Sequence, residues 1–431
     1  MVAGPRMSVS CMAKDLRDIG AMHVFSSALA CLLTVSACGA DWPQFLGAQR
    51  DGRSPEKIAS VFPSTGPEIV WSVPVGEGLA GPAVADGRVI LCHREGDQSV
   101  IEAFAAEGGR KLWRQAQPTE YRDQFGFDNG PRSTPTFSAG MVFAYGADGR
   151  LTCVEAATGA LQWTRDLAVD LEAPSGWFGR ACAPLVVGEL VLVNAGGRWQ
   201  GKPAGVVAFR VADGSVAWAG SQDEASYSSP ITASLAAGPA AVFFTRKGVE
   251  LLNPSTGATL VSEVFEPDIA ASVSACTPVM VGPSRFFLSG CYALGAKVWE
   301  VGPGYTLKTL WAHDDVLDSH YGTPVLFEGH LYGFHGRQEQ GQELRCVRVA
   351  DGVVRWSQRL PAGSVLLAAE TLVVLTEKGE LIVAPATPDG FKPSDRGNIL
   401  AATTRAFPAL TNGLLYARDG KKLVAVRLAA P

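Results

Sequence analysis

The sequence lacks the residue patterns that identify most enzyme classes. It has no Gly-x-Ser-x-Gly elbow, no His-Glu-x-x-His pair, no Cys-x-x-Cys-His haem attachment and no zinc-like cysteine spacing. A phosphate-loop spacing occurs at 196–202, but Pro203 replaces the hydroxyl residue that would hold magnesium. These absences argue against serine hydrolases, zincins, c-type haem proteins and P-loop nucleotide enzymes.

Charge and long apolar runs are also scarce. Charged residues make up 18% of the 431 residues, and the net charge is −5. A slightly acidic chain argues against a nucleic-acid partner, because phosphate contacts need a positive surface. The most apolar stretch, 22–35, is too short to span a membrane.

The amino terminus predicts an export signal. The apolar stretch is followed by small residues at 36–40, so cleavage would leave Asp41 as the first residue. Residues Val35 to Cys38 also resemble a lipobox, which would place a lipid on Cys38. We expect a leader over 1–40 and a periplasmic or extracellular protein, with contact to the outer membrane only through a lipid on Cys38.

Cysteine is sparse beyond this leader, where six of the nine cysteines remain. Cys276 and Cys291 lie symmetrically about the turn 282–285, so a simple hairpin would place them opposite each other. Export permits a disulfide at that position. The alternative is a pair of buried small apolar residues, which is also what we expect of the other four.

Glycine, proline and tryptophan are abundant, and they follow a repeat. In phrases such as Glu155–Trp163 and Val349–Trp356, a glycine turn precedes a short strand that ends in tryptophan. Tryptophan closes six such phrases, at Trp71, Trp113, Trp163, Trp218, Trp311 and Trp356. The intervals are 42, 50 and 55 residues up to Trp218 and 45 between the last two, a period that predicts a β-propeller.

Prolines open the repeats in phase with the tryptophans, at Pro82, Pro135, Pro184, Pro230, Pro278, Pro324 and Pro408. After Pro135, two apolar runs flank a glycine turn, the pattern of a β-hairpin. We therefore expect four strands per repeat. A proline at the start of a strand on the blade's inner edge removes no ladder hydrogen bond.

The repeats predict an all-β fold of eight four-stranded antiparallel blades. Residues 408–428 supply three strands without a closing phrase, whereas 69–73 supplies a closing strand without a preceding repeat. Pairing the two would close the ring. Seven blades is the alternative, because the copies after Trp356 are weak. We expect a lead-in over 41–66 and one propeller domain over 67–431.

The phrase Glu155–Trp163 resembles the repeat of the pyrroloquinoline-quinone-like (PQQ-like) β-propellers, in which the tryptophan docks between blades. Residues 41–52 also resemble a lead-in found on many secreted bacterial members. The resemblance covers nearly all of the chain from Asp41, and it implies that the six closing tryptophans are structural. The family includes quinoprotein dehydrogenases, an outer-membrane assembly lipoprotein and many uncharacterised secreted propellers, so the resemblance alone selects no function.

Features that the resemblance implies for a quinoprotein dehydrogenase are missing. Those enzymes carry adjacent cysteines that form a disulfide over the cofactor, with a calcium ion and an aspartate base, but no adjacent cysteines occur here. No metal ligands are identified. We expect a non-catalytic binding or scaffold module of the cell envelope, with PQQ- and calcium-dependent oxidation of an alcohol or sugar as the alternative. A factor similar to the assembly lipoprotein is a further alternative.

The segments before the opening prolines are expected to ring one mouth of the central channel, where closed β-architectures bind ligands. They carry arginines, aromatic residues and a histidine: Arg132, Trp177, Phe178, Arg180, Tyr227, His320, Tyr321 and Arg405. Guanidinium groups beside aromatic faces suit a planar or extended anionic ligand. An envelope protein is the alternative partner.

The alternative is that these segments line the mouth of the channel with polar groups that bind only water and loop carbonyls. His320 has no paired carboxylate in sequence and is expected to be a hydrogen-bonded loop residue. Trp177 and Trp199 lie outside the docking phrases and are candidates for exposed binding aromatics. For Asp123, Asp128 and Asp318 we expect solvated turns.

Overall fold

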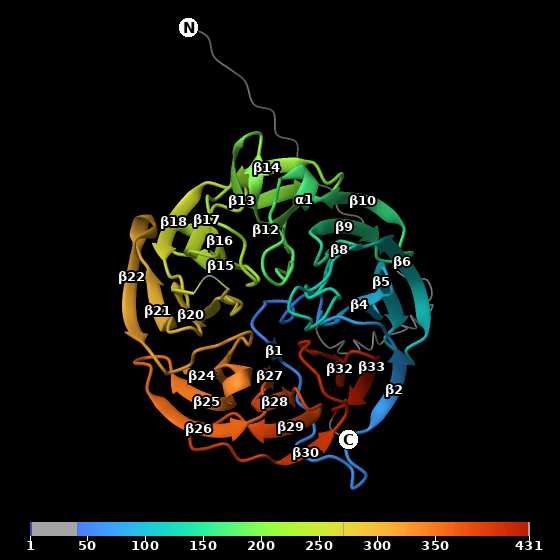
Figure 1. Ribbon diagram of the computed structural model, residues 1–431. Coiled ribbons are helices and arrows are strands. Elements are labelled where there is room, and N and C mark those ends of the chain that lie inside the picture. Colours follow the sequence, from blue (N-terminus) through green and yellow to red (C-terminus); the bar gives the residue numbers. More distant parts are fainter. Residues whose placement is uncertain (2–40, 270, 430–431) are drawn as a thin grey trace. The chain divides into compact units, whose positions relative to one another are not determined.

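The computed structural model describes Met1 and residues 41–269 and 271–429. The expected leader, including Cys38, lies outside these residues apart from Met1. From the lead-in onward the chain forms a ring of eight β-sheets, which confirms the eight-bladed propeller over the seven-bladed alternative (Figure 1). No helix among the described residues is long and apolar enough to cross a bilayer.

Each blade is an antiparallel meander whose first strand lies nearest the axis (Figure 1). Blade 1 contains β3 (Ala83–Ala85), β4 (Arg88–Glu95), β5 (Gln98–Ala105) and β6 (Lys111–Pro118). Blade 2 contains β7 (Thr136–Ser138), β8 (Met141–Tyr145), β9 (Arg150–Glu155) and β10 (Leu161–Asp166). Blade 3 contains β11 (Leu185–Val187), β12 (Leu190–Trp199), β13 (Lys202–Arg210) and β14 (Val216–Gly220). Blade 4 contains β15 (Ile231–Leu235), β16 (Gly238–Phe244), β17 (Gly248–Leu252) and β18 (Thr259–Val264).

The second half of the ring repeats this plan. Blade 5 contains β19 (Val279–Gly282), β20 (Arg285–Gly290), β21 (Gly295–Val301) and β22 (Leu307–His313). Blade 6 contains β23 (Val325–Phe327), β24 (His330–His335), β25 (Gln342–Arg348) and β26 (Val354–Leu360). Blade 7 contains β27 (Gly363–Ala368), β28 (Thr371–Thr376), β29 (Glu380–Pro385) and β30 (Asp395–Asn398). Short helices α1 (Leu167–Asp170), η1 (Pro303–Tyr305) and η2 (Gln338–Gln340) lie in connections.

Blade 8 joins the two ends of the described chain. Its strands β31 (Ala409–Thr411), β32 (Leu414–Arg418) and β33 (Lys422–Arg427) are completed by β2 (Ile69–Pro74). The pairing is antiparallel and sets Trp71 opposite Ala425. This pairing confirms the predicted closure of the ring. The edge of β33 that would otherwise be unpaired is covered by β2.

The six closing tryptophans lie between neighbouring blades. Each indole N–H donates to a backbone carbonyl in the turn of the next blade, at 2.7 to 3.1 Å; the acceptors are Ala106, Ala156, Val211, Pro254, Val349 and Thr387. In five of the six contacts, all except that of Trp356, the glycine of that turn lies against the indole ring, as Gly159 does against Trp113. The repeat phrase therefore contains both residues of the inter-blade contact, since the glycine of one blade packs against the tryptophan of the preceding blade.

A second set of hydrogen bonds links the blades near the axis, through the residues before the opening prolines. The bonds alternate between a backbone N–H donating to a hydroxyl and a hydroxyl donating to a carbonyl, at 2.9 to 3.2 Å: Gly81 to Thr134, Ser133 to Cys182, Ala183 to Ser229, Ser228 to Cys276 and Thr277 to Thr323. All seven predicted prolines lie directly before the first strand of a blade. Proline and its neighbours thus fix the inner ends of the blades.

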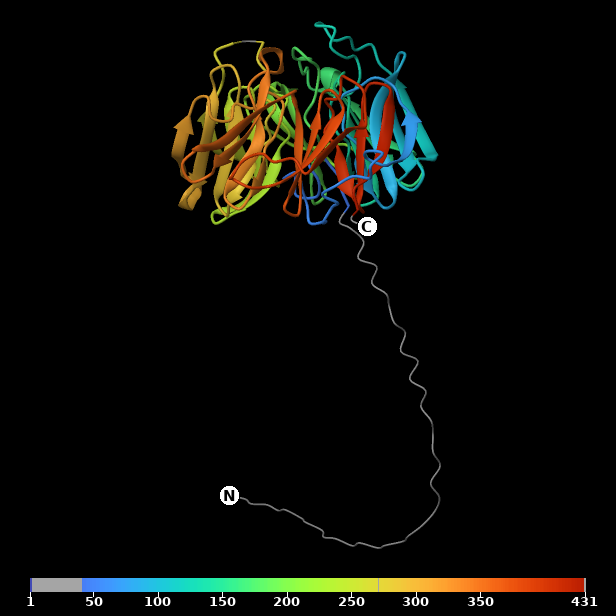
Figure 2. The same cartoon turned by 90° about the horizontal axis from the view of Figure 1, so that it is seen from below.

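The lead-in packs into the ring. Strand β1 (Arg53–Ser54) pairs in parallel with β27, and Trp42 forms a bridge with Val84 of blade 1. The blue lead-in crosses the centre of the ring in Figure 1, and in Figure 2 it lies at the face opposite the teal segment between β6 and β7. It therefore covers one end of the axis.

Arg50 anchors the lead-in at the axis. The residue is 3% exposed, and its guanidinium donates to the carbonyl oxygens of Pro230 at 2.8 Å, Ala183 at 3.3 Å and Pro184. Burial lowers the pKa of Arg50 to about 10, so it stays protonated near neutral pH. One side chain from the lead-in thus ties together the inner ends of blades 3 and 4.

The predicted Cys276–Cys291 disulfide is absent, and both residues are free buried thiols. The hairpin from β19 to β20 shifts register between Met280 and Gly282, so the symmetric pairing assumed from sequence is lost. Each thiol instead donates to a carbonyl, Cys276 to Thr277 at 3.5 Å and Cys291 to Asp318 at 3.1 Å.

Replacing Gly159 by Ala tests the glycine–tryptophan contact. The new Cβ would lie 2.5 Å from the Trp113 ring, at a φ of +74°. Gly140→Ala is the matched control, because Gly140 has a φ of +76° and no atom within 4 Å of that Cβ. We expect the control to lose about 1 kcal/mol of unfolding free energy and Gly159→Ala about 2–4 kcal/mol, measured by urea unfolding. Equal losses would contradict a structural contact.

Arg50→Met tests the axial anchor. The substitution removes the donors of several buried carbonyls, each of which costs about 1–3 kcal/mol when left unpaired. We expect a loss of about 3 kcal/mol or more in unfolding free energy, whereas Arg53→Met at an exposed neighbouring position changes it by less than about 0.5 kcal/mol. A stable Arg50→Met protein would show that the lead-in is held without its guanidinium.

Candidate functional site

A cavity of about 380 Å³ lies at the axial mouth, among the segments that precede the innermost strands. Its lining is mainly aromatic and aliphatic, with three arginines and a histidine. Six of the predicted rim residues line it: Arg132, Phe178, Tyr227, His320, Tyr321 and Arg405. Trp177 and Arg180 do not.

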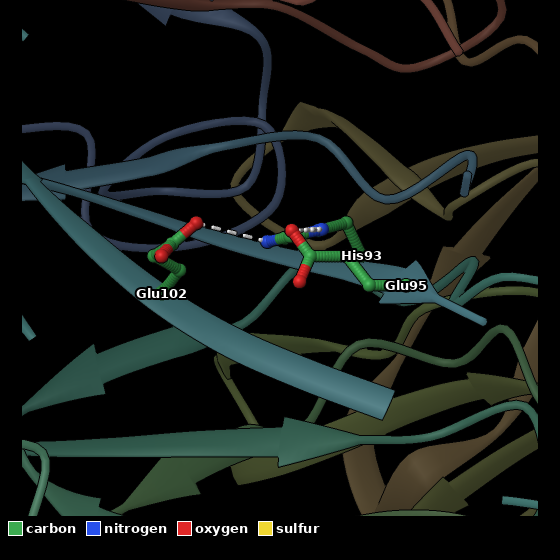
Figure 3. A group of neighbouring side chains, drawn as sticks. All are labelled: His93, Glu95 and Glu102. Atoms are coloured by element: carbon green, nitrogen blue, oxygen red, sulfur yellow. Dashed lines mark hydrogen bonds and ion pairs between the residues drawn. The ribbon is translucent and has the colours of Figure 1, made fainter. Parts of the chain in front are cut away.

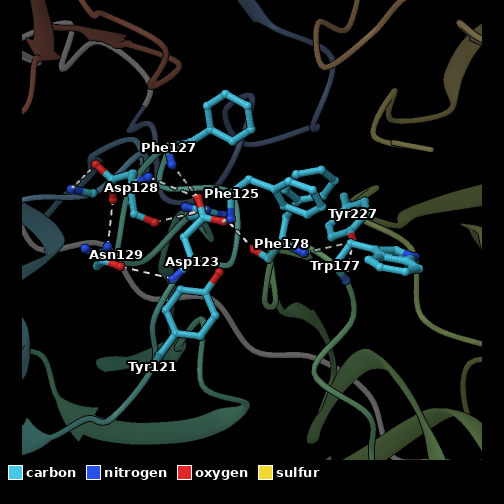
Figure 4. A network of polar contacts seen from close by, with 12 residues as sticks. Tyr121, Asp123, Phe125, Phe127, Asp128, Asn129, Trp177, Phe178 and Tyr227 are labelled. Atoms are coloured by element: carbon cyan, nitrogen blue, oxygen red, sulfur yellow. Dashed lines mark hydrogen bonds and ion pairs between the residues drawn. The ribbon is translucent and has the colours of Figure 1, made fainter. Parts of the chain in front are cut away.

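Aromatic rings from three segments form one wall of the cavity (Figure 4). The Phe125 ring lies 4.9 Å from that of Phe178 and 6.4 Å from that of Phe127, and Phe178 lies 5.7 Å from Tyr227. Opposite, Phe45 of the lead-in meets Phe407 edge to face at 5.1 Å. Such faces favour a flat apolar ligand.

Asp123 shapes the loop that carries Phe125 and Phe127. Its buried carboxylate accepts the backbone N–H groups of Phe125, Phe127 and Asp128 at 2.9 to 3.1 Å, as Figure 4 shows. It also accepts from Arg132 Nη2 at 2.9 Å. The predicted solvated turn at Asp123 is therefore wrong, because its side chain is fully buried.

Arg132 connects this loop to the next rim segment. Its Nε donates to the Phe178 carbonyl at 2.7 Å, and Nη2 also donates to the Asp128 carbonyl at 3.0 Å. The side chain is 9% exposed. Its Nη1 atom is buried and has no hydrogen-bond partner among the described residues. A buried donor without an acceptor is costly, so the guanidinium of Arg132 is not fully satisfied by its neighbours.

Arg405 has a similar arrangement, with its guanidinium 6.0 Å from the ring centres of Phe127 and Tyr321. Its Nη2 lies 3.4 Å from Glu377 Oε2, and its Nε is buried without a hydrogen-bond partner in the described part of the chain. The Tyr321 hydroxyl donates to the same Glu377 carboxylate. Burial, and secondly the Glu377 charge, raise the pKa of Tyr321 far above its usual range. The phenol is therefore a fixed donor, without acid–base function near neutral pH.

His320 is neutral and fully engaged. Burial lowers its pKa, so the uncharged ring prevails at neutral pH. Because Gln338 Oε1 is an acceptor only, Nδ1 carries the proton that it shares with that oxygen. Nε2 then accepts from the Tyr292 hydroxyl at 2.8 Å. With both nitrogens bonded, His320 is a hydrogen-bonded rim residue, as expected.

The other predicted aromatic and cationic residues lie beside the cavity. Arg180 is 4% exposed, its side chain does not line the cavity, and its Nε and Nη2 atoms have no partner among the described residues. Trp177 is 43% exposed, and its ring lies 6.5 Å from Phe125. Trp199 is half-buried against the core between blades 2 and 3, so its predicted exposure is wrong.

Two side-chain clusters outside the cavity have metal-ligand residue types. In the first, His93 Nε2 donates to Glu102 at 3.1 Å (Figure 3). His93 Nδ1 accepts the Gly76 N–H at 3.0 Å. Lys111 lies 2.6 Å from the other Glu102 oxygen. Because both histidine nitrogens are occupied, this cluster is a structural link between blade 1 and the strand that closes the ring.

Asp318 belongs to the second cluster, with Asp315 and His335. Burial, and secondly the Asp315 charge, raise the pKa of Asp318 to about 6. Its Oδ1 atom is buried without a partner among the described residues, so the predicted solvated turn is wrong here too. Asp128 has the expected turn role, because its carboxylate accepts the Gly130 N–H two residues on, but it is half-buried and also accepts the Gly78 N–H.

The sequence patterns did not predict six of the residues that line the cavity: Phe45, Phe125, Phe127, Tyr292, Arg337 and Phe407. Phe407 directly precedes Pro408, so the proline marker contained that signal. Phe125 and Phe127 lie in the long connection between β6 and β7, and Phe45 lies in the lead-in. No repeat pattern places either segment at the axis.

Asp318→Asn tests the buried carboxyl. The folded state holds the Asp318 proton up to about pH 6, whereas the unfolded state releases it near pH 4, so wild-type stability falls between those values as pH rises. The amide does not titrate. We expect Asp318→Asn to gain stability relative to wild type above pH 6 and to gain less at pH 4, measured by thermal unfolding. Asp86→Asn, at an exposed position, is the control. The same difference at both pH values would contradict the raised pKa.

Comparisons with known proteins identify the relatives of this ring. A family model described as outer membrane protein assembly factor BamB matches residues 96–293. BamB of Bordetella pertussis is 30% identical over 184 residues, 39% of this chain and 42% of that protein. The 1-butanol dehydrogenase (cytochrome c) of Thauera butanivorans is 28% identical over 191 residues, 42% of this chain and 26% of that protein. Each alignment therefore spans less than half of the relative.

Solved structures share the fold at low identity. BamB from Moraxella catarrhalis superposes with a TM-score of 0.61 at 13% identity, covering 84% of this chain and 97% of that one. The quinohemoprotein alcohol dehydrogenase from Comamonas testosteroni gives 0.59 at 13% identity, covering 91% and 81%. Residues 96–293 and the tryptophan phrases therefore resemble the PQQ-like repeat β-propellers in sequence, and the eight-bladed ring shares the fold of these solved structures.

Proposed function

We propose that this propeller is a non-catalytic binding module of the cell envelope whose axial cavity takes a largely apolar ligand with one anionic group. The observation that carries the proposal is a set of three buried guanidinium nitrogens without hydrogen-bond partners among the described residues, Arg132 Nη1, Arg337 Nε and Arg405 Nε, on side chains that line an aromatic cavity. A carboxylate or sulfonate oxygen would satisfy such donors, and the rings would hold the apolar body.

The charges of the cavity limit the ligand to few anionic groups. Its three arginines are each paired with one carboxylate: Arg132 with Asp123 at 2.9 Å, Arg337 with Glu339 at 3.3 Å and Arg405 with Glu377 at 3.4 Å. The ionised groups therefore cancel, and His320 is neutral. The charge of each guanidinium group is already balanced by a carboxylate of the protein, so a ligand gains hydrogen bonds but little net charge attraction. We therefore infer a ligand with one anionic group rather than several.

Access is from one face only. The lead-in covers the opposite end of the axis, and its Phe45 forms part of the cavity lining. Arg50 fixes that segment to blades 3 and 4. A ligand therefore enters past Phe125 and Phe127 and stops against Phe45.

The residues do not fit the calcium-bound PQQ of a quinoprotein dehydrogenase. PQQ has three carboxylates, whereas the cavity charges already cancel. Calcium takes six to eight oxygen ligands, but Glu339, the one carboxylate among the described lining residues, is paired with Arg337. His320 also has no free nitrogen for a base. We therefore keep dehydrogenase activity as the alternative and derive no step through the cofactor.

Export and an envelope partner are part of the proposal. The amino-terminal sequence supports export, and the relatives matched by name include an outer membrane protein assembly factor. A scaffold that contacts an envelope protein through its loops is the nearest alternative. It would leave the cavity without a ligand.

Binding of 1-anilinonaphthalene-8-sulfonate, an apolar aromatic anion, tests the proposal by fluorescence titration. We expect one site per chain and about 10- to 100-fold weaker binding to Arg405→Met, because one charge-assisted hydrogen bond is lost. Arg122→Met is the matched control, since Arg122 is exposed and paired with Asp97 outside the cavity. The uncharged analogue N-phenyl-1-naphthylamine should bind wild type and Arg405→Met equally.

Two outcomes would contradict the proposal: unchanged anion affinity in Arg405→Met, or equal binding of the anion and its uncharged analogue to wild type. Calorimetric titration with PQQ, with and without calcium, tests the alternative. Calcium-dependent binding at one site would favour a dehydrogenase.

A further inference from the structure

The cavity continues outward into an exposed aromatic surface. Phe125, Phe127 and Trp177, here called the aromatic rim, are 48%, 56% and 43% exposed. Their rings are neighbours, with Phe125 at 6.4 Å from Phe127 and 6.5 Å from Trp177. Trp177 does not line the cavity. A molecule confined to the cavity would leave the Trp177 ring in water.

The aromatic rim is held in a fixed arrangement. Asp123 accepts the backbone N–H groups of Phe125 and Phe127, and the Tyr227 hydroxyl accepts the backbone N–H of Trp177 at 3.0 Å. The same hydroxyl lies 3.2 Å from the Phe178 backbone nitrogen and accepts its proton. Large apolar side chains held rigidly at the surface indicate a contact surface for a partner.

The closed floor restricts which part of a partner enters. Phe45 lines the cavity, and Arg50 of the same lead-in bonds the inner end of blade 4, so we infer that the lead-in prevents an extended chain from threading through the ring. A chain end fits a blind cavity, whereas an internal segment would have to fold back inside it. The unpartnered groups inside are guanidinium donors, which select a carboxylate over an amino group.

We propose that the cavity receives the carboxyl-terminal end of an extended peptide with an aromatic last residue, while the aromatic rim covers the residues before it. This inference rests on the proposed binding function of the same cavity. The terminal carboxylate bonds Arg132 Nη1 and Arg405 Nε, and the last side chain packs between Phe45, Phe407 and the Phe178 wall. Trp177 then contacts the peptide outside the cavity.

Fluorescence anisotropy with a labelled hexapeptide tests the inference on the full chain from Asp41. The probe is Gly-Ser-Gly-Ser-Gly-Phe labelled at its amino end, with a free carboxylate or a carboxyl-terminal amide. We expect the free acid to bind at least tenfold more tightly than the amide. N-acetylphenylalanine should compete with it, but with at least fivefold weaker affinity than the unlabelled peptide.

The variant Trp177→Ala separates the aromatic rim from the cavity. It should weaken the peptide at least threefold and leave N-acetylphenylalanine unchanged, with Arg122→Met as the control. Thermal unfolding of each variant checks folding, and the acid-against-amide comparison uses wild type alone, so it stands even if a variant fails to fold.

The outcomes distinguish the inference from the proposed function. Equal affinity of acid and amide, or a peptide that binds no more tightly than N-acetylphenylalanine, overturns the peptide inference. If the anilinonaphthalene anion still binds in an Arg405-dependent manner, the proposed function survives that result. If neither the anion nor any peptide binds, both are overturned.

Discussion

The pairing of β2 with β33 is the constraint on which the rest of the structure depends. It closes the eighth blade at its outer edge, and the residues that precede β2 lie across the centre of the ring (Figure 1). The lead-in before β2 can therefore cross the ring, where Arg50 binds carbonyls of blades 3 and 4 and Phe45 reaches the cavity. The pairing of β2 with β33 thus closes the ring. The lead-in that precedes β2 lies across one end of the axis.

Electrostatics explains why an aromatic cavity at this position keeps three arginines. Each guanidinium has a carboxylate partner, so the cost of burying its charge is offset within the protein. Asp123 has a double role, since it compensates Arg132 and also fixes the loop that presents Phe125 and Phe127. Among the described residues, Arg132 Nη1, Arg337 Nε and Arg405 Nε have no hydrogen-bond partner, and we propose the guanidinium groups of Arg132 and Arg405 as the polar recognition groups of the cavity.

The number and boundaries of the blades could be predicted from the sequence, because the tryptophan and proline markers occur once in most blades. The sequence also placed Arg132 and Arg405 and three of the aromatic residues of the cavity, Phe178, Tyr227 and Tyr321, since each lies shortly before an opening proline. It could not show that Arg180 faces away from the cavity, because side-chain direction in a loop follows no period. The register shift at Met280 defeated the Cys276–Cys291 pairing, and the burial of Asp123 depends on contacts with a residue nine positions away.

The central claim is that the axial cavity holds a carboxylate between Arg132 and Arg405, with an apolar group against the aromatic wall. A crystal structure of the protein from Asp41 onward, grown with N-acetylphenylalanine, tests it most directly. The account predicts the carboxylate within hydrogen-bond distance of Arg132 Nη1 and Arg405 Nε, and the ring beside Phe178. Density for ordered water alone at both nitrogens, at saturating ligand, would contradict it.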